Sequence, residues 1–179
     1  MTVNVTAPAA PAAPAALGSP TDREALFWTS IKDGTDPVAF EAYLKQYPGG
    51  TFAALARQRV VSLGVARFDG TWDVTVVCPV HTDGALGFTY RFLAQVKDGI
   101  LDGQHSDREG LSVTFKGKIQ PDGSANLEAR GVTADPKYSV GGVKKGTPFG
   151  WRAPARFEGS RGTGTRTELR ICHLAFVKQ

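Results

Sequence analysis

The sequence has no long hydrophobic run, which argues against a membrane-spanning helix. No apolar stretch approaches the roughly 20 residues that a helix needs to cross a bilayer, so we expect no membrane span. Residues 1–20 also lack the basic and Leu/Val-rich regions of a signal peptide. Because the chain begins inside an Ala/Pro tract, we expect it to be part of a longer protein whose export signal, if it has one, lies upstream.

Cysteine is also scarce. The two cysteines, Cys78 and Cys172, belong to no Cys-x-x-Cys pair, and the sequence gathers no further ligands around them for a metal. We predict a disulfide between them; the alternative is two reduced, packed thiols. If the disulfide forms, it implies a periplasmic or secreted protein.

No catalytic constellation is visible. His105-Ser106-Asp107 contains triad residue types, but sequence neighbours cannot assemble a triad, which is built across a fold. The Gly162-x-Gly164 segment lacks the helix and lysine of a phosphate-binding loop and is typical of a hairpin turn. His81 and His173 lie in other elements. We therefore predict a protein that is not an enzyme and has no cofactor and no metal.

Basic residues are unevenly distributed. The formal net charge is +4, and one C-terminal stretch is rich in Lys and Arg. A nucleic-acid binder uses such a stripe, interleaved with aromatic residues, for phosphates and base stacking. Without a recognised motif the pattern is more typical of solvated strand faces, so nucleic acid is not the expected partner. The basic residues of this stretch are Lys137, Lys144, Lys145, Arg152, Arg156, Arg161, Arg166 and Arg170.

The chain divides into three segments by composition: an Ala/Pro-rich linker (1–20), a helical segment (21–66) and a β domain (67–179). Thr21, with Glu24 at capping-box spacing, predicts the start of a first helix, and Asp36-Pro37 predicts the start of a second. A third helix is expected from Thr51. The second helix has one continuous apolar face, formed by Phe40, Tyr43, Leu44 and Tyr47.

From Phe68 onward, apolar residues alternate with polar ones, which indicates antiparallel strands. Asp98-Gly99 and Asp122-Gly123 predict hairpins, and the glycine-rich residues 159–164 predict a connection between the last two strands. A weak eighth strand falls at 138–143. The fold class is thus α+β, a three-helix segment followed by an antiparallel barrel of about seven or eight strands, or a sandwich. If a disulfide joins the first strand to the last, it favours the closed barrel.

Many large side chains are expected to point into this barrel and to fill it solidly. A hollow interior of several hundred Å³ would instead indicate a small-molecule carrier. The expected inward residues are Phe88, Tyr90, Phe92, Phe115, Phe149, Trp151 and Phe157.

The segment from Trp28 to Arg57 contains Asp36-Pro37, Tyr47-Pro48 and the run Phe-Ala-Ala-Leu-Ala-Arg at 52–57. It resembles tetratricopeptide-like helical hairpins, and more closely a helical segment beside the protease domain of bacterial caspase-like proteins. The β segment resembles an uncharacterised C-terminal domain of such multidomain proteins. The resemblance implies an accessory element without catalytic residues.

Gly70-Thr71-Trp72 opens the first strand. It resembles the Gly-x-Trp signature of the calycins, the lipocalin and avidin families. That resemblance implies that Trp72 plugs the closed end of the barrel and that Arg170 or Lys178 stacks on its ring.

Together these features predict a non-catalytic interaction or regulatory module of a larger bacterial protein. Its partner would be another protein or a tethered upstream catalytic domain. The alternative is a small-ligand carrier with a lipocalin-like or avidin-like cavity. For the protein partner, the expected contacts come from aromatic residues of the helical segment: Trp28, Phe40, Tyr43 and Tyr47.

Overall fold

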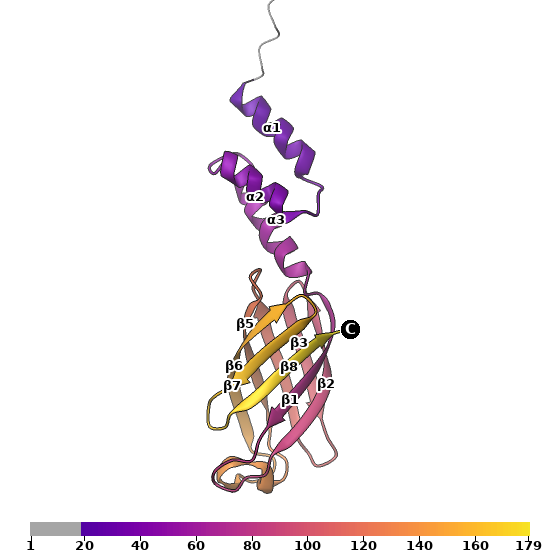
Figure 1. Cartoon of the computed structure of the whole chain (residues 1–179), viewed down its shortest axis with the longest axis vertical. Coiled ribbons are helices and arrows are strands. Elements are labelled where there is room, and N and C mark those ends of the chain that lie inside the picture. The colour runs from indigo at the N-terminus through magenta and orange to yellow at the C-terminus, as the bar shows by residue number, and fades with distance from the viewer. Residues whose placement is uncertain (1–18) are drawn as a thin grey trace, which may run out of the picture.

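The computed structural model describes residues 19–179, so the predicted linker lies almost entirely outside the described residues (Figure 1). Three helices come first: α1 (Pro20–Ile31), α2 (Pro37–Gln46) and α3 (Ala53–Ala66). Within the described residues, no helix is both long and apolar enough to span a membrane.

Helix α1 begins earlier than the capping pattern at Thr21 predicts. Ser19 is the N-cap: its hydroxyl accepts from the Asp22 N–H at 3.2 Å, and the Asp22 carboxylate accepts from the Ser19 N–H at 2.8 Å. Pro20 occupies the first helical position, where a missing N–H costs nothing. Ser19 therefore completes a full capping box, which releases Glu24 for another role.

The three helices build a small core of their own. Trp28 stacks on Phe52 with ring centroids 5.0 Å apart, and Phe40 and Tyr43 are completely buried. Tyr47 is half-buried against the same cluster. The aromatic residues predicted to bind a partner thus hold the helices together, because three short helices have little other apolar surface to bury.

Glu24 and Tyr43 form the polar centre of this core. The Tyr43 hydroxyl donates to the Glu24 carboxylate at 2.6 Å and accepts from the Phe52 N–H at 3.2 Å. Burial, together with the hydrogen bond to Glu24, raises the pKa of Tyr43 to about 12. The folded chain therefore favours the neutral phenol more than the unfolded chain does.

This pairing predicts that the helices lose stability at high pH. Above pH 10 the unfolded chain releases the Tyr43 proton, whereas the folded chain retains it until about pH 12. The stability of the wild type relative to Tyr43→Phe should therefore fall as pH rises from 10 to 12. Urea unfolding at pH 8, 10 and 11 measures this difference. Tyr47→Phe is the control, and a wild-type advantage over Tyr43→Phe that is constant with pH would contradict the prediction.

Eight antiparallel strands then close into a barrel, in which each strand pairs with the next and β8 pairs with β1. This arrangement confirms the predicted α+β fold and decides for the barrel over the sandwich. The strands are β1 (Gly70–Cys78), β2 (Phe88–Lys97), β3 (Ile100–Ser106), β4 (Ser112–Ile119), β5 (Ser124–Val132), β6 (Pro148–Glu158), β7 (Arg161–Arg166) and β8 (Cys172–Lys178).

The seventh strand differs from the prediction. Residues 161–164, expected in a glycine-rich connection, belong to β7, and the hairpin turn is shorter, at 159–160. A Cβ on Gly162 would lie 2.8 Å from the Phe157 ring, so the glycine leaves room for that ring on the paired strand. The weak strand expected at 138–143 is instead two 3₁₀ turns, η1 (Pro136–Tyr138) and η2 (Val140–Gly142).

The helices meet the barrel at one end, where the chain enters β1 (Figure 1). Trp72 and Phe68 are both fully buried there, and the Trp72 indole N–H donates to the Phe68 carbonyl at 2.8 Å. Lys178, opposite Trp72 on β8, donates from Nζ to the Arg67 carbonyl at 2.9 Å. This end of the barrel is closed by packed side chains.

The predicted disulfide is present. Cys78 ends β1 and Cys172 begins β8, with Cα atoms 4.3 Å apart, and both residues are buried. The two strands are neighbours in the sheet, so the bond crosses the seam at which the barrel closes.

Candidate functional site

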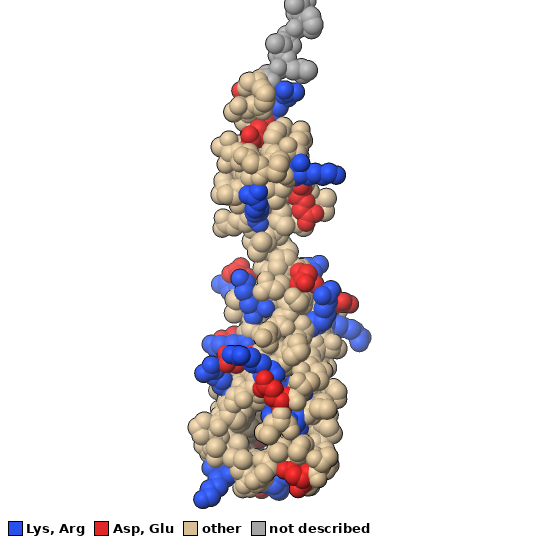
Figure 2. All heavy atoms as spheres, turned by 90° about the vertical axis from the view of Figure 1, so that its left-hand side faces the viewer, with Lys and Arg blue, Asp and Glu red and all other residues tan. Residues whose placement is uncertain are grey.

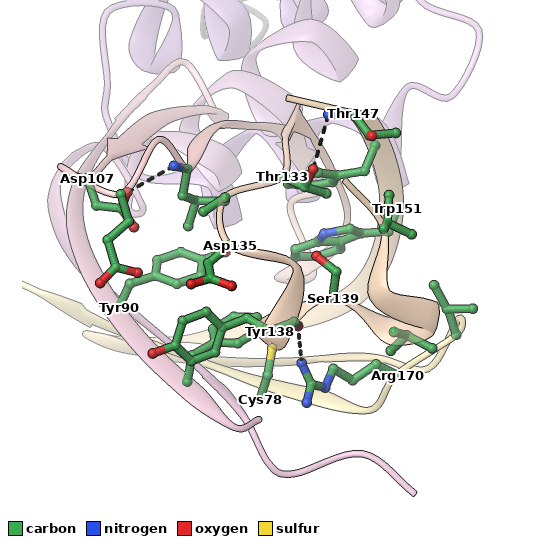
Figure 3. A pocket seen from close by; sticks show the side chains of 18 of the residues that line it. Cys78, Tyr90, Asp107, Thr133, Asp135, Tyr138, Ser139, Thr147, Trp151 and Arg170 are labelled. Atoms are coloured by element: carbon green, nitrogen blue, oxygen red, sulfur yellow. Dashed lines mark hydrogen bonds between the residues drawn. The ribbon is translucent and has the colours of Figure 1, made fainter. Parts of the chain in front are cut away.

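A pocket of about 600 Å³ lies at the barrel end opposite the helices (Figure 3). Its walls are inward side chains of the strands and residues of the loops 107–111, 133–147 and 167–171. The expectation of a solidly filled barrel is therefore wrong at this end. The inward aromatic residues are unevenly distributed: Phe115 and Phe157 are fully buried in the core, whereas Phe88, Tyr90 and Phe149 line the opening.

Aromatic rings form most of the pocket wall. Trp151, only 6% exposed, packs edge-on against Phe115 with centroids 5.4 Å apart and so separates the pocket from the core beneath it. Phe88 and Tyr90 stack at 6.0 Å on β2, and Tyr138 of η1 meets Phe88 edge-on. Flat rings on several sides suit a ligand that is itself flat and apolar.

Arg170 ties the loops around the pocket together. Its guanidinium donates to the Tyr138 carbonyl at 2.9 Å (Figure 3) and to the Ala85 and Leu86 carbonyls at 2.9 and 2.8 Å, so it joins its own loop to the loops 79–87 and 133–147. It lies 5.2 Å over the Phe88 ring and is 4% exposed. The prediction that Arg170 stacks on Trp72 is thus wrong: Arg170 precedes β8, at the end opposite Trp72.

Asp83 forms a second set of hydrogen bonds between the loops at the rim. Its carboxylate accepts from the N–H groups of Ala85 at 3.0 Å and Gly141 at 2.7 Å, and it contacts His81 at 2.8 Å. These hydrogen bonds, with the two backbone donors foremost, hold the pKa of Asp83 well below its usual value. The loops carrying the rim are therefore joined to each other by fixed polar contacts.

Arg166 is the charged group on the inner wall. Residues 162, 164 and 166 of β7 alternate inward, and the Arg166 guanidinium carbon lies 5.2 Å over the Trp151 ring. Its Nε donates to the Glu168 carbonyl at 3.0 Å. Burial lowers the pKa of Arg166 from its usual value. Burial raises the pKa of Tyr90, and the nearby Arg166 charge partly offsets this rise. The guanidinium remains cationic at neutral pH, since arginine does not lose its proton in proteins.

The carboxylates of the pocket lie at its rim, and two of the three are already engaged. Asp107 accepts from the N–H groups of Gly110 and Leu111, both at 2.9 Å. Asp135 accepts from the Lys137 N–H and pairs with its ammonium at 2.9 Å. Glu109 is exposed to solvent. The inner wall thus has a positive charge while the negative charges stay outside.

The three histidines lie in separate parts of the barrel. His105 faces inward and stacks on Tyr90 at 4.6 Å, His81 pairs with Asp83 in the β1–β2 loop, and His173 points outward from β8. Within residues 19–179, no cluster of three His, Cys, Asp or Glu side chains is placed to hold a metal ion.

Basic and acidic side chains are mixed on the barrel exterior (Figure 2). Arg130 pairs with Glu128 at 2.7 Å, and Arg156 contacts both Glu158 and Asp122. The basic residues of β5 and β6 therefore have acidic neighbours on the same face. Such mixing is what a solvated surface shows.

Comparison of the chain with protein families, with curated proteins and with solved structures finds no match.

Proposed function

We propose that this chain binds a small, largely apolar molecule in the open end of its barrel. The observation that supports this most directly is the pocket of about 600 Å³, within the range of about 300–1,000 Å³ typical of ligand sites. A cavity of this size lined by aromatic rings is costly to leave to water, because the rings give up contacts that a ligand would restore.

The rim supports binding as well. Arg170 and Asp83 hold the loops in one arrangement before any ligand arrives, and a preformed site loses little conformational entropy on binding. The disulfide, whose Cys78 lines the pocket, supports a periplasmic or extracellular location for this binding.

Attachment to a protein partner is the second hypothesis. It requires aromatic faces of the helices that are free to bind, whereas Phe40 and Tyr43 are fully buried within the helical segment. The pocket, with its aromatic walls and two arginines, is the site with chemistry suited to a ligand.

A neutral fluorescent probe tests the proposal. N-phenyl-1-naphthylamine should bind the full chain with one saturable site and a gain in fluorescence, since it would leave water for the aromatic pocket. Ser139→Trp should abolish this binding. Ser139 lines the pocket, its backbone is extended (φ −98°), and its hydroxyl makes no hydrogen bond within the described residues, so the indole can enter the cavity.

Ser160→Trp is the matched control. Ser160 is exposed in the turn between β6 and β7, at the other end of the barrel, and the same substitution there should leave probe binding unchanged. Equal binding to the two variants, or no saturable binding to the wild type, would mean that the pocket is not a ligand site.

A further inference from the structure

Two cationic side chains line one largely apolar pocket without a carboxylate partner. Among the described residues, neither Arg166 nor Arg170 has an acidic group within ion-pair distance. Placing a charge away from water is unfavourable unless an opposite charge or several hydrogen bonds compensate it. Three hydrogen bonds compensate Arg170, whereas Arg166 leaves a positive charge on the inner wall with no carboxylate paired to it.

The two arginines differ in how many of their N–H donors are already hydrogen-bonded. Both Nη atoms of Arg170 donate to loop carbonyls, so this residue acts mainly on the rim, although its buried Nε has no partner among residues 19–179. Arg166 uses only Nε, toward the Glu168 carbonyl, and its two Nη groups make no hydrogen bond within the described chain. Arg166 thus has a free donor fork at the pocket wall.

The position of Arg166 is set by the strand pairing. The last residue pair between β6 and β7 is Ala155–Gly164, so toward the pocket β6 continues without β7 beside it. Arg166 lies where this pairing has stopped, with its guanidinium over the Trp151 ring. A planar anionic group at the Nη atoms would accept two parallel hydrogen bonds while its apolar body lay among the rings.

We infer that the pocket selects aromatic monoanions, a flat apolar body bearing one carboxylate or sulfonate that the Arg166 guanidinium binds. This inference rests on the proposed function and names the ligand class of the same site. The rim carboxylates Asp107 and Glu109, which have no ion-pair partner among the described residues, favour this orientation, because they repel an anion from the mouth while the inner wall attracts it.

A matched pair of probes tests the inference. N-phenyl-1-naphthylamine and 8-anilinonaphthalene-1-sulfonate share one ring skeleton and differ by the sulfonate. The wild-type chain should bind the sulfonate at least about tenfold more tightly than the neutral probe, the effect of one charge-assisted hydrogen-bonded contact. Arg166→Gln should weaken sulfonate binding by about ten- to a hundredfold and change neutral-probe binding less than about twofold.

Arg161→Gln is the control for net charge. Arg161 belongs to the same strand but points outward and is exposed, so its replacement removes the same charge and should leave both affinities unchanged. Equal loss of sulfonate affinity in the two variants would mean that only overall charge acts, and the inference would be overturned.

The two proposals fail in different ways. If the neutral probe binds and Ser139→Trp blocks it, but the wild type shows no preference for the sulfonate, the pocket is a ligand site and the anion inference is wrong. If neither probe gives saturable binding, the proposed function itself is wrong. The wild-type preference decides the inference even if Arg166→Gln does not fold.

Discussion

Removal of the Cys78–Cys172 disulfide is expected to lower the free energy of unfolding by about 4 kcal/mol. The bond closes a loop with a sequence separation of 94 residues, and loops of this length restrict the unfolded chain most strongly. It also lies where β1 meets β8, the seam on which the closure of the barrel depends. A loss of this size corresponds to roughly 10–20 °C in melting temperature.

Two measurements separate the cross-link from the packing of the sulfur atoms. Urea unfolding of wild-type protein refolded with and without reductant compares the same side chains with and without the bond. Cys78→Ala/Cys172→Ala should be destabilised to a similar extent and should not respond to reductant. Coincident unfolding curves for reduced and oxidised wild type would show that β1–β8 pairing closes the barrel unaided.

The barrel could be predicted from the sequence because two local signals agreed. Alternation of apolar residues marked inward positions such as Val74 and Phe92, and Asp98-Gly99 supplied a turn that only positive backbone φ angles allow. The cysteines then placed the first strand beside the last. Each of these signals acts over a few residues or through one covalent bond, so it needs no knowledge of the tertiary structure.

Strand β7 could not be recognised in the same way. Its inward positions include Gly162 and Gly164, which have no apolar side chain to create the alternation. The glycines are there because the Phe157 ring and Ala155 of β6 fill that space, a fact of packing between strands. Once residues 159–164 are assigned to a connection, the pattern that shows which side chains of β7 point inward is lost, and Arg166 is one more basic residue of a C-terminal stretch.

The pocket was missed for a related reason. Counting large inward residues predicts a full barrel, but it does not tell where along the barrel axis each ring lies. Phe115, Phe157 and Phe176 gather near Trp72 or beneath Trp151, whereas Phe88, Tyr90 and Phe149 stand at the rim. Whether the barrel is hollow depends on where its aromatic side chains lie along the axis, and the number of such side chains does not give that position.

The resemblance to the calycins also could not identify which basic residue lies near Trp72. The Gly-x-Trp motif implied a basic residue from the last strand on Trp72, and Arg170 lies close to that strand in sequence. Arg170 precedes Cys172, at the start of β8, whereas the residue opposite Trp72 is Lys178 at its end. A strand of seven residues separates the two ends of the barrel, so a choice between them requires the register.

Trp72→Ala is expected to cost about 4 kcal/mol, comparable to loss of the disulfide. The Trp72 side chain is fully buried, contacts the Phe157 ring edge-on at 5.3 Å and donates to the Phe68 carbonyl, so its removal leaves both a cavity and an unpaired buried acceptor. Because this end also receives α3, the loss should appear in the unfolding of the whole barrel. Chemical unfolding followed by far-ultraviolet circular dichroism measures it.

A series of tryptophan to phenylalanine changes gives the test its control. Trp72→Phe keeps a ring but loses the indole N–H, and should cost about 2 kcal/mol, since the Phe68 carbonyl is left without its donor. Trp28→Phe, at a half-buried position in the helical core, should cost less, because Trp28 makes no side-chain hydrogen bond within the described residues.

Folded Trp72→Phe should still bind N-phenyl-1-naphthylamine, since Trp72 lies at the closed end of the barrel, away from the pocket. Equal costs at the two positions would contradict the role of Trp72 as the plug of the closed end, and loss of probe binding in folded Trp72→Phe would show that the two ends of the barrel are coupled.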